Sequence, residues 1–108
     1  MSLDTRVDFS GLHRLADGRV AGDVVLAVTG SVAGIPLSFH DSKPFDFPRN
    51  GAQEVLNIVV PVNRLSLRVT AKVYERDNQC CVQGHIHVDA PIGGGIGKDL
   101  DANCHPIP

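Results

Sequence analysis

The fold is decided by residues 64–89, which read RLSLRVTAKVYERDNQCCVQGHIHVD. Apolar and polar residues alternate strictly in the first half of this stretch. The apolar positions are Leu65, Leu67, Val69, Ala71 and Val73. A period of two is typical of a strand that buries one face. A helix would scatter the same apolar residues around its circumference, so this half is predicted to form a β-strand.

The second half is predicted to return as the partner strand of a hairpin. Asp77 and Asn78 suit a two-residue turn, which pairs apolar or glycine residues along one face. The polar face then pairs Tyr74 with Cys81, Lys72 with Gln83, Thr70 with His85, Arg68 with His87 and Ser66 with Asp89. A four-residue loop would slide these pairs but keep both faces. A one-residue slip would bury His85 and His87, so the histidines are predicted to face outward.

Similar patterns recur along the rest of the chain. Residues 19–29 and 56–62 are rich in apolar residues, and residues 35–40 form a short strand that Pro36 confines to an edge or a strand start. A turn at Asp17 and Gly18 precedes the first of these segments. We therefore expect an all-β fold. The expected architecture is a single-domain antiparallel β-sandwich of about six to eight short strands, with a small β-barrel as the alternative.

Two segments are expected to lack regular structure. Residues 41–53 hold two prolines and an Asn-Gly pair, which predicts an irregular loop. Phe45 and Phe47 within it either fill the core or form an exposed hydrophobic docking loop. Residues 91–108 are rich in glycine and proline and are expected to form a flexible C-terminal tail. The sandwich domain is accordingly assigned to residues 1–90.

Charge and composition narrow the classes of partner. The 108 residues include 10 Lys and Arg against 12 Asp and Glu, for a net charge of −2. A nucleic-acid-binding domain usually carries an excess of clustered basic residues, so we expect no nucleic-acid partner. Aromatic residues make up only 5% of the chain and Trp is absent, which weakens any prediction of a base-stacking surface.

The sequence also bears on the compartment. The most apolar run, residues 55–62, is interrupted by Asn57 and Pro61 and is too short to span a membrane, so we expect no membrane partner. The first ten residues contain acids and no apolar stretch, unlike a secretory signal peptide. Three cysteines are unlike the even sets of secreted disulfide scaffolds. We therefore expect a reduced, cytoplasmic protein with separate thiols.

The outward side of the hairpin between Arg64 and Asp89 is the strongest candidate for a binding surface. It gathers hydrogen-bond donors and cations from Arg68, Thr70, Lys72, Tyr74, His85 and His87. Such groups suit a carboxylate, a phosphate or an acidic protein surface. The first hypothesis is a non-catalytic binding or assembly module that contacts an acidic partner or anionic ligand. A protein partner or self-association fits best because the surface is expected to be flat.

The same histidines support an alternative hypothesis, a mononuclear metal-dependent enzyme. Residues two apart on a strand share a face, so His85 and His87 can reach one ion, with His40 as a third ligand from another strand. Zinc or iron would suit this set, and Asp89 or Cys81 extends the row. Arg68 and Lys72 argue against it because a cation site should not be lined with cations. Under the first hypothesis, a non-catalytic binding module, neither folding nor function is expected to need a cofactor.

Overall fold

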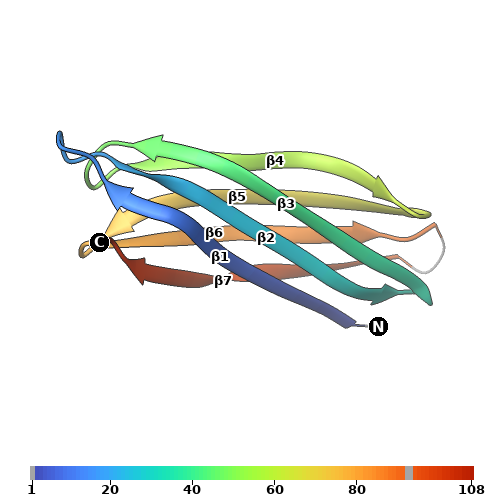
Figure 1. The fold of residues 1–108 in the computed structure, drawn as a ribbon. Coiled ribbons are helices and arrows are strands. Elements are labelled where there is room, and N and C mark those ends of the chain that lie inside the picture. Colours follow the sequence, from blue (N-terminus) through green and yellow to red (C-terminus); the bar gives the residue numbers. More distant parts are fainter. Residues whose placement is uncertain (1, 92–93) are drawn as a thin grey trace.

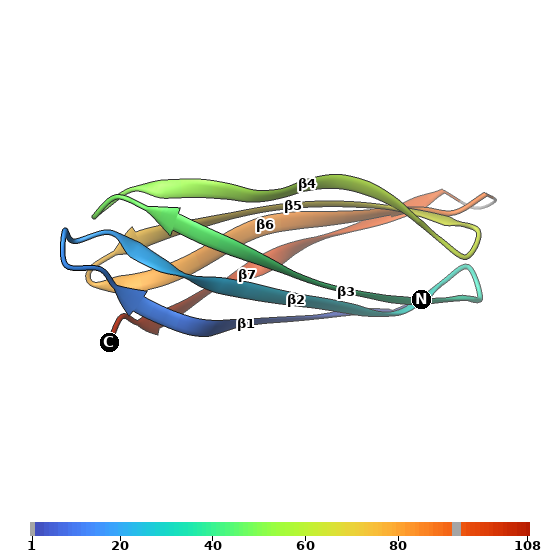
Figure 2. The same cartoon turned by 45° about the horizontal axis from the view of Figure 1, so that its top comes forward.

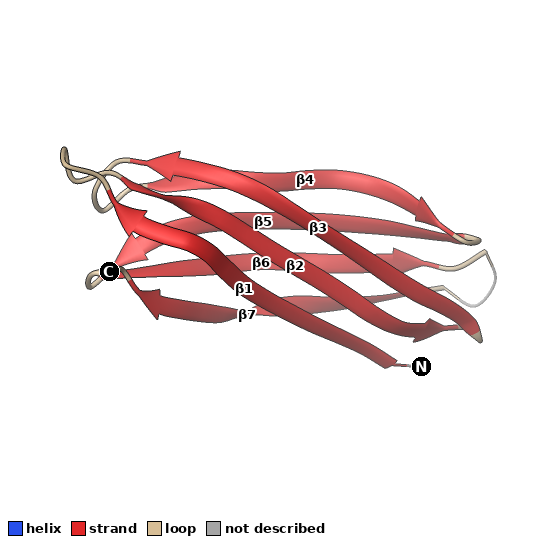
Figure 3. Ribbon diagram, viewed as in Figure 1, coloured by secondary structure: helices blue, strands red, loops and turns tan. Residues whose placement is uncertain are grey.

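The computed structural model describes residues 2–91 and 94–108, and of residues 101 and 102 it describes the backbone alone. Every regular element in this part of the chain is a β-strand (Figure 3). The seven strands are β1 (Ser2–Arg14), β2 (Val20–Val32), β3 (Ile35–Phe47), β4 (Ala52–Val62), β5 (Leu65–Arg76), β6 (Gln79–Asp89) and β7 (Gly95–Pro106). A search of the described residues finds no helix able to span a membrane.

The strands form two antiparallel sheets, ordered β1-β2-β3 and β4-β5-β6-β7 (Figure 1). Consecutive strands are neighbours within each sheet, and the chain changes sheets between β3 and β4. The two sheets stack as layers of a rod that measures 51 × 18 × 18 Å (Figure 2). The expected sandwich is confirmed. The barrel alternative is wrong, because the described strands pair as two separate sheets.

The hydrophobic core lies between the sheets and takes alternate residues of the central strands. On β5, Leu67, Val69 and Val73 are fully buried. On β2, residues 24, 26 and 28 are buried, while Val25 and Ala27 on the other face are half-buried. The strands were predicted from this same alternation. It places the intervening polar residues on the solvent-facing side of each sheet.

The predicted hairpin register is confirmed at every position. β5 and β6 pair Arg68 with His87 and Thr70 with His85, and the apolar pairs fall on the opposite face. Asp77 and Asn78 form the turn, with φ of 53° and 62°. Both values lie in the left-handed region that a type I′ hairpin turn requires and that Asp and Asn tolerate well.

The irregular loop expected over residues 41–53 is wrong. β3 continues to Phe47 and β4 begins at Ala52, so the connection is a short turn. Pro44 fits within β3 because β3 is an edge strand, where alternate backbone N–H groups have no strand partner, and Pro48 lies in the turn after it. Phe45 and Phe47 are 4% and 1% exposed and stack at 5.7 Å between ring centroids, so they fill the core and do not form a docking loop.

The flexible tail expected over residues 91–108 is also wrong for most of its length. Gly95–Pro106 forms β7, which pairs along β6 as the fourth strand of the larger sheet. Leu100 is buried against Gly84, where a Cβ would lie only 2.8 Å from the Leu100 Cδ1 atom. Residues 92 and 93 lie outside the described residues.

The N-terminal segment adds a strand that the sequence patterns did not identify. Ser2–Arg14 forms β1, which pairs with β2 and has an irregular register between Ser10 and His13. The expected turn at Asp17 and Gly18 joins these strands, and the Gly18 N–H donates a hydrogen bond to the Leu15 carbonyl at 2.9 Å.

The cysteines depart from the expectation of separate thiols. Cys81 on β6 and Cys104 on β7 lie opposite each other and form a disulfide, which leaves Cys80 as the buried free thiol. Disulfides persist mainly in oxidising compartments. The cysteine count therefore no longer supports a reduced compartment. The disulfide was not expected because Cys104 was assigned to a flexible tail and not to a strand that pairs with β6.

Candidate functional site

The six candidate binding residues share one surface of the larger sheet. Arg68, Thr70, Lys72 and Tyr74 come from β5, and His85 and His87 come from β6. We call these six residues the outer face. Their side chains are exposed or half-exposed, while the residues between them are buried in the core. Strand alternation therefore places all six on the solvent side of one rigid, hydrogen-bonded hairpin.

The β5 side of the outer face carries two free cations. Arg68 and Lys72 are both exposed, and four residues of strand separate their Cα atoms by about 13 Å. Among the ion pairs formed by described residues, none includes either side chain. The ammonium group of Lys72 lies 5.8 Å from the centroid of the Tyr74 ring, a cation–π contact that orients both side chains.

The β6 side is different because each histidine has a carboxylate partner. Nδ1 of His85 donates a hydrogen bond to Oδ1 of Asp99 at 2.7 Å, and Nε2 of His87 donates one to Oδ1 of Asp89 at 3.0 Å. Asp99 belongs to β7, so sequence reasoning missed it when it treated that strand as a tail. The outer face thus has a cationic strip on β5 and a histidine–carboxylate strip beside it.

Two glycines of β7 make room for the imidazole rings. A Cβ added to Gly95 would lie 2.9 Å from Nε2 of His87. A Cβ added to Gly97 would lie 3.1 Å from Nε2 of His85 and 3.3 Å from Nδ1 of His87. The glycines that made this segment look flexible are therefore the positions over which both histidine rings lie.

The surface around Lys72 is only shallowly hollowed. A hollow of about 180 Å³ is lined by Glu54 of β4 together with Thr70, Lys72 and Gln83. Sites for small ligands usually enclose roughly 300–1,000 Å³. This hollow is smaller and contains an acid, so it suits one side chain of a protein partner better than a free anion.

His40 does not join the other two histidines. It lies on β3 in the three-stranded sheet, exposed on the opposite side of the sandwich from His85 and His87. The described residues contain no group of three or more His, Cys, Asp or Glu side chains placed to hold a metal ion. The three-histidine zinc or iron site of the alternative hypothesis is therefore wrong, because its third ligand belongs to the other sheet.

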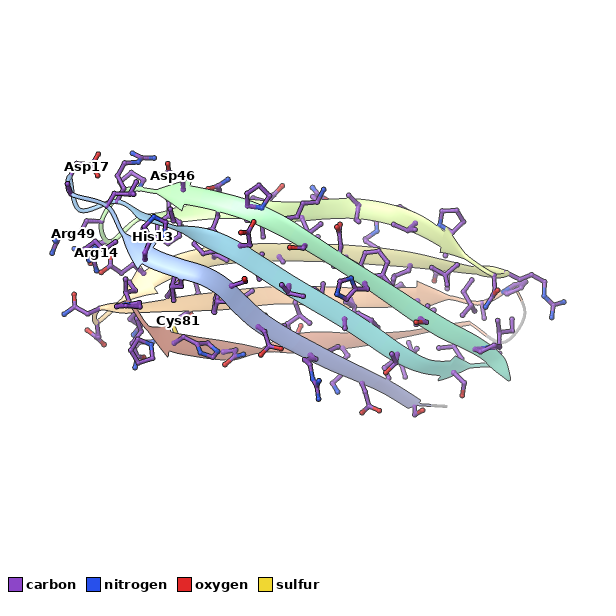
Figure 4. The ribbon with its side chains drawn as sticks, in the orientation of Figure 1. His13, Arg14, Asp17, Asp46, Arg49 and Cys81 are labelled. Atoms are coloured by element: carbon purple, nitrogen blue, oxygen red, sulfur yellow. A yellow bond between two sulfur atoms is a disulfide. The ribbon has the colours of Figure 1, made fainter. Side chains whose placement is uncertain are left out.

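A second polar group lies at the end of the sandwich that holds the β1–β2 turn, where Figure 4 labels Arg14 and Arg49. Arg14 and Glu75 form an ion pair at 2.6 Å, with side chains 19% and 1% exposed. The Asn50 N–H donates to the Glu75 carboxylate at 2.8 Å, and Arg14 donates to the Gly18 carbonyl at 2.8 Å. We call Arg14, Gly18, Asn50 and Glu75 the turn-end cluster.

The turn-end cluster stabilises the ionised form of its buried carboxylate. The hydrogen bond from Arg14 holds the pKa of Glu75 below its ordinary value, against the opposing effect of burial, and the Asn50 N–H adds to the lowering. The cluster ties β1 and the β3–β4 turn to β5. Its charges are satisfied internally, so it is a structural feature.

Cys80 is an unsuitable nucleophile. Burial, with a further contribution from the negative charge of Glu75, raises the pKa of the Cys80 thiol to about 12. A reactive cysteine needs an accessible thiolate near neutral pH. Cys80 is fully buried and stays protonated, so it acts as a small apolar core residue.

Comparison with known proteins adds no family to these observations. No protein-family model, curated protein or solved structure matches the chain.

Proposed function

We propose that the protein is a non-catalytic binding module whose outer face contacts an acidic surface of a protein partner. The observation that carries this proposal is the pair of exposed cations, Arg68 and Lys72, on one rigid strand. Carboxylates on a partner could pair with these side chains, neither of which forms an ion pair with a described residue. Thr70 and Tyr74 lie between and beside the cations and add hydroxyl groups for hydrogen bonds.

The shape of the surface supports a protein partner over a small anion. The outer face belongs to a sheet about as long as the 51 Å rod, and its hollow is shallow and partly acidic. Exposed charges contribute to binding mainly by steering association and by excluding wrong partners. Val59 of β4, opposite Arg68, is 57% exposed and offers an apolar contact beside the cations.

Poly-L-glutamate is a suitable probe for this proposal. Binding to the intact protein is measured by titration calorimetry at about 50 mM salt and again at about 500 mM salt, where screening should weaken it. The double variant Arg68→Ala/Lys72→Ala is expected to bind roughly tenfold more weakly at low salt.

A matched control removes the same charge from elsewhere. Arg6→Ala/Lys43→Ala neutralises one arginine on β1 and one lysine on β3, both in the three-stranded sheet. This control should bind poly-L-glutamate as the wild type does. Absence of binding by the wild type, or equal losses in the two double variants, would overturn the proposal.

A further inference from the structure

The remaining ring nitrogens of the two histidines of the outer face lie near the same glycine of β7. Each ring uses one nitrogen as a donor to a carboxylate, Nδ1 in His85 and Nε2 in His87. A neutral imidazole with one N–H carries a lone pair on its other nitrogen. The nitrogens with lone pairs, Nε2 of His85 and Nδ1 of His87, both lie within 3.3 Å of the Cβ position of Gly97.

This arrangement has the second layer of contacts that metal-binding histidines usually show. A histidine ligand commonly donates its other ring N–H to a carboxylate, which fixes the tautomer and makes the free nitrogen more basic. Here Asp99 does this for His85 and Asp89 does it for His87. The missing Cβ of Gly97 leaves room beside both rings.

We propose that His85 and His87 form a two-ligand surface site for a divalent transition metal that prefers imidazole, with water as the remaining ligands. Cu²⁺, Ni²⁺ and Zn²⁺ belong to this class, and Cu²⁺ binds most tightly to a given nitrogen site. The site lies on β6 within the same outer face, next to the cationic strip of β5.

The surrounding charges permit a cation at this position. Asp89 and Asp99 lie next to the histidines and contribute two negative charges. On the neighbouring strand, Arg68 lies opposite His87, and Lys72 lies opposite Gln83, next to His85 on the same face. The two carboxylates therefore balance these two cations, so the positive charge of the neighbouring strand does not by itself exclude a metal ion.

Titration of the protein, without an affinity tag, with Cu²⁺ alone tests the site. Calorimetry or the copper absorption spectrum should show one equivalent bound in the wild type. His85→Gln and His87→Gln should each weaken this binding at least tenfold. Asp99→Asn should weaken it roughly tenfold, because it removes the orienting carboxylate but leaves both ligands. Gly97→Ala should weaken it as well, since the added Cβ would crowd both imidazole rings.

His40→Gln is the matched control, because it removes an exposed strand histidine from the opposite side of the sandwich. Its binding should equal that of the wild type. Failure of the wild type to bind one equivalent, or binding that His85→Gln and His87→Gln leave unchanged, would overturn the proposal. Circular dichroism of each variant confirms that a loss of binding is not a loss of fold.

Discussion

The turn-end cluster and the outer face carry the same kinds of charged residue in opposite surroundings. Arg14 and Glu75 meet at 2.6 Å, and the Glu75 side chain is 1% exposed. His85 and Asp99 meet at a similar 2.7 Å, yet their side chains are 49% and 86% exposed. Breaking a buried pair leaves an uncompensated charge, whereas an exposed pair contributes little to stability. The distance between the paired atoms therefore does not distinguish charged groups that stabilise the fold from those available for binding. The exposure of their side chains does.

The largest stability effect is expected from the disulfide that joins β6 and β7 beside the turn-end cluster. Cys81→Ser/Cys104→Ser should lower the free energy of unfolding by about 3 kcal/mol, because the loop closed by the bond is no longer restricted in the unfolded chain. Denaturant unfolding measures this change, and Cys80→Ala, which keeps the bond, is the comparison. A double variant as stable as the wild type would show that the bond does not form.

Glu75→Gln should have the next largest effect. The amide keeps the size of the side chain but removes the charge that Arg14 and the Asn50 N–H contact. We expect a loss of about 2 kcal/mol in the free energy of unfolding, as for buried hydrogen bonds to charged groups. Asp99→Asn changes the carboxylate of an exposed pair in the same way and should leave the unfolding midpoint nearly unchanged. Equal effects of the two substitutions would contradict the comparison.

The effect of Glu75 should also depend on pH. Its pKa is lowered in the folded protein, so its ionised form stabilises the fold fully above the ordinary value of 4.5. This contribution is lost as the pH falls through the lowered pKa, where the folded protein also takes up the proton. The stability difference between wild type and Glu75→Gln should therefore be constant near neutral pH and shrink below about pH 4.5. Denaturant unfolding from pH 7 to pH 3 measures it, and a difference that grows on acidification would reverse the assigned sign.

Substitutions on the outer face should have the smallest effect on stability. Arg68→Ala and Lys72→Ala remove exposed side chains and should move Tm by no more than about 2 °C. Thermal unfolding followed by circular dichroism measures this. A loss comparable to that of Glu75→Gln would mean that these cations hold the fold together and would remove the basis for treating them as binding residues.

Strands were predicted correctly where apolar and polar residues alternate strictly. They were missed where the side chains show no such alternation. β5 and β6 were placed in register because a one-residue slip would have buried two histidines. β7 was missed because Gly95 and Gly97 have no side chains to alternate, and Asp99 was lost with it. The extension of β3 was missed because proline signals a loop unless the strand is known to be an edge, and that position depends on the whole topology.

The turn-end cluster illustrates a second limit. Glu75 falls on a core-facing position of the alternating strand, which indicates a buried charge, but its partner Arg14 lies 61 positions away along the chain. Their pairing arises when the two sheets stack, which no local pattern records. The outer face could be predicted because its six residues lie on one hairpin. Asp99, which contacts His85, and Glu54, which lies opposite Lys72, could not be placed there because they come from the strands on either side of that hairpin.

The most direct test of the proposed function is a backbone amide NMR titration of the protein with poly-L-glutamate at low salt. The proposal predicts that chemical-shift changes concentrate at Arg68, Thr70 and Lys72 on β5 and at His85 and His87 on β6, and that they diminish as salt is added. Changes concentrated instead around Arg14 and Arg49 at the turn end, or the absence of changes at any concentration of the polymer, would contradict it.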